Sequence, residues 1–263
     1  MLTVLKNSKG YGLKGQLYLV PAPLDFGCDE ATDLQAILPL GTLRVAAGLS
    51  HWVCENAKSA RAYLKRIDQV VPLCQCIQAM QLVELPREVH KKGDHHGDFD
   101  ARYLLQPALD GHNLGFISEA GMPAVADPGS SVVRAAHDLG VSVVALVGPV
   151  SLLLALASSG LNGQNFAFVG YLPQEVSARI QRIRELESFA LSSGQTQMLI
   201  ETPYRNGVML QALLQTLKHN TRLSVSSQLT LHDAQTISDS VKNWHHKTVA
   251  MNNATPAVFA IGR

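Results

Sequence analysis

The stretch LGFISEAGMPAVADPGSSVVRAAHDLGVSVVALVGP, residues 114–149, decides the fold of this chain. Leu114–Ile117 is a short apolar run, and Val141–Val147 is an almost unbroken β-branched run. Between them, Asp127-Pro128-Gly129 introduces a helix. Apolar strands on either side of a helix are typical of a parallel sheet covered on both faces. Ligands bind at the carboxyl ends of such strands, so we expect a site in the loops after Ile117 and Val147.

Composition narrows the class of protein. The 263 residues are 46% hydrophobic and 16% charged, which predicts a sizeable core in one large domain or two ordinary ones. A net charge of +1 gives no overall field that would select nucleic acid or a membrane as partner. No apolar run approaches the roughly 18 residues of a spanning helix, and no apolar region of signal-peptide length follows the N-terminal lysines. We therefore expect a cytoplasmic protein with no membrane partner.

The cysteines and histidines do not form a recognisable metal motif. Cys28, Cys54, Cys74 and Cys76 lack zinc-site spacing, and reduced thiols are the preferred interpretation. His95-His96-Gly97-Asp98 is either a metal cluster or, more commonly for such a pair, a set of surface residues. It lies in a polar, locally basic loop over 83–100 that would be solvent-exposed or substrate-facing. We predict no metal.

The remaining pattern predicts two α/β halves. A break over 159–163 separates a domain at 15–160 from a second at 164–263. Trp244 falls in a stretch whose pattern assigns no element. Strands are expected at 16–20, 42–46, 114–117, 141–147, 166–169, 197–200, 223–228 and 257–261, and helices at 34–38, 54–67, 101–110, after 129, and at 151–158, 177–189 and 206–217.

Several common enzyme motifs are absent. The chain has no G-x-G-x-x-G after its first strand, no Walker loop and no G-x-S-x-G elbow. Those absences remove the usual dinucleotide, nucleoside-triphosphate and hydrolase interpretations.

Four segments carry a family resemblance. They are LYLVPAPL (17–24), FISEAGMPAVADPG (116–129), VVALVGPVSLLLALASSGL (143–161) with FAFVGYLP (166–173), and IETPYR (200–205). In this order they resemble the tetrapyrrole methylase superfamily of S-adenosylmethionine-dependent methyltransferases. Within it, they are most similar to the branch of 16S ribosomal-RNA ribose 2′-O-methyltransferases. The second segment is the long and unusual one; the others would be weak alone.

The resemblance implies two α/β domains of the tetrapyrrole methylase type, with S-adenosylmethionine in the cleft between them, and a homodimer. Close backbone approach to the cofactor would explain Gly121 and Gly148. Its amino group and ribose hydroxyls require acceptors, for which Glu119 and Asp127 are candidates. The cofactor-binding residues implied are Pro23, Ser118, Glu119, Ala120, Gly121, Met122, Pro123, Asp127, Gly148, Pro149 and Ser151.

Two points stay open at these residues. Asp127 stands in an Asp-Pro-Gly turn before Ser130-Ser131, so it is equally well explained as a helix N-terminal signal. The ribosomal branch commonly has Ala-Glu-Asp-Thr-Arg where this chain has Cys54-Glu55-Asn56-Ala57-Lys58. Lys58 lacks the planar, bidentate guanidinium group of the family's arginine, which would alter phosphate or carboxylate recognition there.

The leading hypothesis is methyl transfer to a ribose 2′-hydroxyl of ribosomal RNA, alone or in the small ribosomal subunit. Glu55 and Glu201 are weak candidates for a general base. Lys58, Arg61, Arg87 and Arg205 are candidate phosphate contacts. The alternatives are methylation of a small molecule such as a tetrapyrrole, and a non-catalytic relative that only binds cofactor or RNA.

Overall fold

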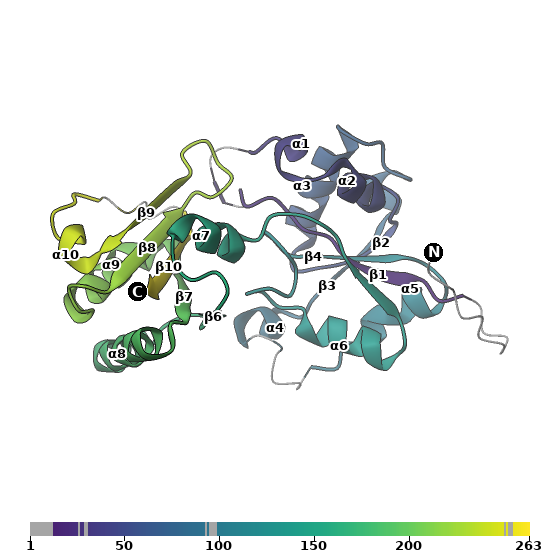
Figure 1. The fold of residues 1–263 in the computed structure, drawn as a ribbon. Helices are drawn as coiled ribbons and strands as arrows, with labels where there is room; N and C mark the ends of the chain where they lie inside the picture. Colours follow the sequence, from purple (N-terminus) through teal and green to yellow (C-terminus); the bar gives the residue numbers. More distant parts are fainter. Residues whose placement is uncertain are drawn as a thin grey trace. The chain divides into compact units, whose positions relative to one another are not determined.

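The computed structural model describes residues 13–25, 27–28, 31–92, 94, 99–249, 251 and 255–263, with the backbone alone at 90–92 (Figure 1). The His95–Asp98 cluster considered above lies outside these residues. The chain forms two compact units. One comprises the chain up to Ala22 with Leu38–Gly148, and the other comprises Pro23–Ile37 with Pro149–Arg263. Each unit has its own five-stranded sheet, so the predicted α/β class with two sheets is confirmed.

The first sheet is entirely parallel, as the apolar runs predict. Its strand order is β3-β2-β4-β1-β5, and the central pairing sets Leu17 of β1 opposite Leu114 and Val143. All five carboxyl ends therefore meet at one edge. The strands are β1 (Gln16–Leu19), β2 (His51–Cys54), β3 (Gln81–Glu84), β4 (Leu114–Ile117) and β5 (Ser142–Ala145).

Helices cover both faces of this sheet. Figure 1 shows α2 (Leu40–Ala47) and α3 (Ala57–Asp68) on one face. On the other lie α4 (Arg87–Lys92), α5 (Gln106–Leu109) and α6 (Ser130–Asp138). Short 3₁₀ helices stand at Ile77–Ala79 and Arg102–Leu105. Phe116 and Leu114 of β4 pack with Val132 and Ala136 of α6, so the opening stretch builds the centre of this core.

The strand predicted at 42–46 is wrong, because this segment is helix α2. Its buried residues Thr42, Leu43, Ala46 and Ala47 follow helical rather than alternating spacing. Strands β2 and β3 were not predicted. The helix predicted from Cys54 begins at Ala57 instead, because Cys54 ends β2 and Asn56 caps the helix.

The second sheet is mixed, with the order β6-β7-β10-β8-β9. β6 and β7 are parallel, and the other three pairings are antiparallel. Strand β9 and helix α10 were not predicted; Trp244 ends α10, is buried, and donates from Nε1 to Leu223 O at 2.8 Å. The elements are α1 (Leu34–Ile37), α7 (Ser151–Ser159), β6 (Phe166–Phe168), α8 (Val176–Ser193), β7 (Thr196–Glu201), a 3₁₀ turn (Pro203–Arg205), α9 (Asn206–Thr216), β8 (Arg222–Ser227), β9 (Gln235–Ser240), α10 (Val241–Trp244) and β10 (Ala257–Gly262).

Alternate residues of β10 pack on opposite faces of this sheet. Phe259 and Ile261 contact the cluster formed with α8 and α9, whereas Val258 and Ala260 contact Leu156 and its neighbours on α7. Helix α7 therefore belongs to the second compact unit. That division falls at Gly148, earlier than the boundary near 160 expected from the Gly-rich break; the domain limits 15–160 and 164–263 stay a prediction.

In the part of the chain that the structure describes, no helix is long and apolar enough to cross a membrane.

Candidate functional site

The loops after β1 and β4 are held together at the carboxyl edge of the first sheet. Ala22 and Gly121 exchange two backbone hydrogen bonds, from Ala22 N to Gly121 O at 2.8 Å and from Gly121 N to Ala22 O at 3.1 Å. Gly121 has φ 72°, a conformation that glycine adopts without strain. Two loops that were separate segments in the sequence therefore form one surface.

Side chains from α2 and α3 form hydrogen bonds that hold the loops at the same edge of the sheet. The Tyr63 hydroxyl donates to Pro21 O at 2.8 Å, and Thr42 Oγ1 donates to Val147 O at 2.7 Å. A Cβ at Gly148 would overlap the ring of Pro21. The glycine at 148 is thus required by contact between the loops after β1 and β5. Cofactor approach is not needed to explain it.

Carboxylates gather on this edge. Glu55 follows β2, Glu119 follows β4, and Ser59 Oγ on α3 donates to Glu119 Oε1 at 3.3 Å. Burial, together with the neighbouring Glu55 and Glu119, raises the pKa of Asp127 from 3.8 to about 7. Three carboxyl groups therefore lie close enough on this edge to affect one another's ionisation.

Asp127 does not cap the helix that follows it. The N-cap of α6 is Gly129, which makes no side-chain cap bond. Asp94 provides the cap from a distant segment, since its Oδ2 accepts from Gly129 N and Ser131 N, both at 2.9 Å. Asp127 makes no hydrogen bond within the residues that the structure describes. The helix-signal interpretation of Asp127 is therefore wrong, and its carboxyl group remains for another use.

The loop leading to α6 is strained as well as acidic. Ala124 and Ala126 have φ of 63° and 64°, a region that non-glycine residues occupy at a cost of about 1–3 kcal/mol each. The Ser118 hydroxyl is buried and has no hydrogen-bond partner among the described residues. Strain and an unsatisfied buried hydroxyl are typical of a loop shaped for a ligand.

Replacing Asp94 by alanine is expected to destabilise the first unit by about 2–4 kcal/mol, because the Gly129 and Ser131 backbone N–H groups would lose their common acceptor. Burial alone would raise the pKa of Asp94, but hydrogen bonds from Ser131, Ser130 and Gly129 outweigh it and hold the pKa below 3.8. Its contribution is therefore present above about pH 4 and is lost as pH falls through the folded pKa. Urea unfolding at neutral pH and near pH 3 measures both effects. An equal loss at both pH values would contradict the ionised cap.

The other predicted site residues take no part in the contacts described so far. Pro23, Pro149 and Ser151 belong to the second compact unit. In that unit Glu201 is buried and pairs with Arg205, Oε2 to Nη2, at 3.3 Å, so the candidate base and the candidate phosphate contact engage each other. Lys58, Arg61 and Arg87 are exposed side chains of the first unit. Among the remaining loop residues, Met122 packs against the first core and Pro123 is buried.

Sequence reasoning missed the residues that support the edge. Asn56, noted above as a departure, is the N-cap of α3, with Oδ1 accepting from Lys58 N at 2.9 Å. The roles of Thr42, Ser59, Tyr63 and Asp94 depend on contacts between distant segments, for which the sequence carried no signal. No disulfide joins the four cysteines, and no group of three or more metal-ligating side chains occurs within the described ranges.

Comparison with known proteins relates the chain to methyltransferases. Residues 53–243 match the family model for tetrapyrrole (corrin/porphyrin) methylases. Proteins named ribosomal RNA small subunit methyltransferase I are similar to it. That of Mesorhizobium japonicum is 28% identical over 83% of this chain and 65% of its own length, and that of Streptococcus pyogenes is 30% identical over 78% and 61%. That of Vibrio cholerae is 32% identical over 52% and 46%. The chain thus spans about half to two thirds of these relatives.

Solved structures share the fold. The methyltransferase CobJ gives a TM-score of 0.58 at 14% identity and covers 95% of this chain and 94% of its own. Uroporphyrin-III C-methyltransferase from Thermus thermophilus, solved with S-adenyl homocysteine, gives 0.53 at 18% identity, with 95% and 98% covered.

Proposed function

The chain belongs to the tetrapyrrole methylase family, and we propose that it is an S-adenosylmethionine-dependent methyltransferase that acts on a ribose 2′-hydroxyl of ribosomal RNA. The names of its relatives from three bacteria support ribosomal RNA as the acceptor, and the sequence resemblance supports the ribose 2′-hydroxyl. The sequence resemblance also supports a cytoplasmic homodimer.

The single observation that carries the cofactor assignment is the acidic edge of the first sheet. S-adenosylmethionine bears a sulfonium and an ammonium group, so it suits a loop where Glu119 and Asp127 make no ion pair within the described residues. Its hydroxyls and amino group require acceptors, which these carboxylates supply. The buried Ser118 hydroxyl offers one further unsatisfied group. The residues present therefore fit the cofactor.

The chain's own contribution is positioning. The donor supplies an activated methyl group, so in-line transfer depends mainly on how the reacting atoms are held. The paired loops at Ala22 and Gly121, fastened by Tyr63 and Thr42, form a surface that is fixed before a ligand arrives. Pro23, Pro149 and Ser151 are further proposed cofactor contacts, and the sequence resemblance alone supports them.

The proposed contacts to the RNA substrate are exposed, positively charged side chains. Lys58 and Arg61 lie on α3, directly after the candidate base Glu55, and Arg87 begins α4. Solvent-exposed lysines and arginines of this kind position a phosphate backbone without reading its sequence. Binding to RNA should therefore weaken steeply with added salt.

Replacing Glu119 by glutamine is expected to weaken S-adenosylmethionine binding about tenfold, because a charge-assisted hydrogen bond becomes a neutral one. Calorimetry measures the dissociation constant. Glu88→Gln is the matched control, since Glu88 is an exposed acid of α4 in the same unit, and it should bind normally. Unchanged affinity in the Glu119 variant would remove this residue from the cofactor site.

An assay with a radiolabelled methyl donor identifies which molecule accepts the methyl group. The protein is incubated with labelled donor and either small-subunit RNA or a small-molecule extract, and we expect label in the RNA, at ribose 2′-oxygens. Label only in the extract would establish the small-molecule alternative. Cofactor binding without any transfer would favour a non-catalytic relative, and absence of binding would overturn the proposal.

A further inference from the structure

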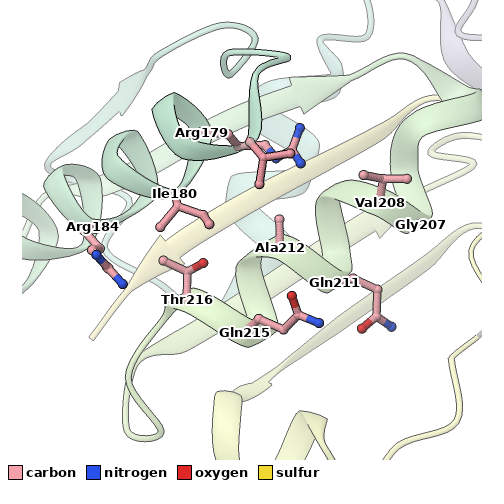
Figure 2. Close-up of a pocket in the computed structure, with 10 residues that line it drawn as sticks. Arg179, Ile180, Arg184, Gly207, Val208, Gln211, Ala212, Gln215 and Thr216 are labelled. Carbon is pink, nitrogen blue, oxygen red and sulfur yellow. The ribbon is translucent and has the colours of Figure 1, made fainter.

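A groove of about 440 Å³ runs between α8 and α9 on the second unit, within one compact body and separate from the acidic edge. Figure 2 shows its side chains, with Arg179 toward one end and Arg184 toward the other. Its ten lining residues include these two arginines and no acid. They are Val176, Arg179, Ile180, Arg184, Gly207, Val208, Gln211, Ala212, Gln215 and Thr216.

Arg179 is a buried cation that makes no ion-pair contact among the described residues, although the Glu175 carboxylate lies near enough to interact with its charge. Its side chain is only 6% exposed, although it lines the groove. Nη1 donates to Gln174 O at 3.0 Å, and Nε has no partner among the described residues. The Glu175 carboxylate is committed to capping α8, accepting from Ser177 N and Ala178 N. A buried charge is costly unless an anion pairs with it.

The position of Arg179 in its helix adds to that cost. It stands in the first turn of the 18-residue helix α8, where the helix dipole already presents positive charge. Arginine is stabilised at the opposite end of a helix. Neither burial nor the dipole favours a cation at this position, and the bond to Gln174 O uses only one of the guanidinium N–H donors. An anion in the groove would be favoured by both the guanidinium and the dipole.

The rest of the lining points to a nucleotide unit. Arg184 is exposed and makes no ion pair among the described residues, giving a second cation on the same groove. Gln211 and Gln215 offer amide donors and acceptors, while Ile180 and Ala212 give apolar contact. Outside the lining residues, Tyr204 is 71% exposed and lies three residues before Gly207 in the sequence. Cations that hold a backbone beside an aromatic ring that stacks a base are typical of single-stranded nucleic-acid binding.

We propose that the α8–α9 groove is a phosphate-binding site of the second unit, in which the Arg179 fork binds a phosphodiester of single-stranded RNA. The phosphate chemistry follows from the groove itself. The choice of RNA over a small phosphorylated molecule rests on the proposed function.

The test compares Arg179→Met with Arg182→Met. Arg182 is a matched control, because it lies on the same helix outside the groove and pairs with Glu185 at 3.2 Å. Fluorescence anisotropy with a short labelled single-stranded RNA is measured over a salt series, with uridine 5′-monophosphate and inorganic phosphate as competitors. We expect Arg179→Met to lose about tenfold in RNA affinity and the salt slope to fall by about 0.7, one phosphate's share. Arg182→Met should match the unmodified protein.

Thermal melting separates binding from folding. Removing an unpaired buried charge should leave the melting temperature unchanged or raised, while a structural role predicts a clear fall. Equal RNA affinity in both variants, or a fall in melting temperature with no specific loss of binding, would overturn the proposal. A loss confined to the mononucleotide would assign the groove to a small phosphorylated molecule and overturn the RNA assignment.

Cofactor binding keeps this proposal distinct from the proposed function. Arg179→Met should bind S-adenosylmethionine normally, since the residue is not part of the acidic edge. If the unmodified protein transfers no methyl group but binds RNA through Arg179, the proposed methyltransferase function is wrong and the proposed phosphate-binding role of the groove is confirmed.

Discussion

Replacing Gly129 by alanine should destabilise the first unit by about 3–5 kcal/mol, because two penalties add. Gly129 has φ 135° and ψ −10°, a conformation that residues with a Cβ rarely adopt. The added Cβ would also overlap the ring of Phe116, which is fully buried in β4. Neither the turn nor the core strand can move without disturbing the other. The free energy of unfolding in urea measures the loss.

Gly41→Ala is the control for this change. Gly41 lies within α2 of the same unit, and a Cβ there meets nothing within 4 Å. Alanine should therefore stabilise the helix by about 0.5–1 kcal/mol. A Gly129→Ala protein that unfolds at the same urea concentration as the unmodified one would show that the turn into α6 is not as described.

The opening stretch predicted its own structure well because its pattern is local. β4, α6 and β5 are each specified by a short run of side chains that contact one another, and Phe116 and Val132 meet across that unit. The strand wrongly expected at 42–46 shows the limit. Thr42 and Leu43 suit a strand by propensity, but packing on α3 and the Thr42 bond to Val147 O favour a helix there.

The general rule for parallel sheets located the candidate site, but the residues that hold its loops in place could not be predicted from the sequence. That strand ends carry the ligand loops follows from topology, and it directed attention to Ser118–Pro123. The cap supplied by Asp94 joins segments 35 residues or more apart, as the bond to Gly129 N shows. Without the fold, Asp127 was the nearer and equally reasonable cap. Removing it from that role is what makes its raised pKa informative about function.

Replacing Asp127 by asparagine is expected to stabilise the protein at pH 8 and, at the same pH, to weaken cofactor binding. The pKa of Asp127 is raised from 3.8 to about 7, so between these values the folded protein keeps a proton that the unfolded chain has released. Unfolding free energy therefore falls as pH rises through this window, by up to about 4 kcal/mol at roughly 1.4 kcal/mol per pH unit. Asparagine does not titrate, so the variant should be about 2–4 kcal/mol more stable above pH 7.

Cofactor affinity should change in the opposite sense. If the Asp127 carboxyl faces the cationic methyl donor, binding favours its ionised form, and affinity for S-adenosylmethionine rises with pH through about 7. S-adenosylhomocysteine lacks the sulfonium charge, so its affinity should rise less. In Asp127→Asn both ligands should bind with little dependence on pH. Asp110→Asn, an exposed change in the same unit, should leave both profiles as they are.

The two readouts together distinguish a binding group from a structural one. A side chain kept for stability makes the protein weaker when it is neutralised, and Asp127→Asn would then unfold more easily at pH 8. A carboxylate that binds a cationic ligand destabilises the protein without ligand. It stabilises the complex, because the bound ligand supplies the missing positive charge. A stabilised variant whose cofactor affinity and pH profile match those of the unmodified protein would show that the Asp127 carboxyl does not face the methyl donor.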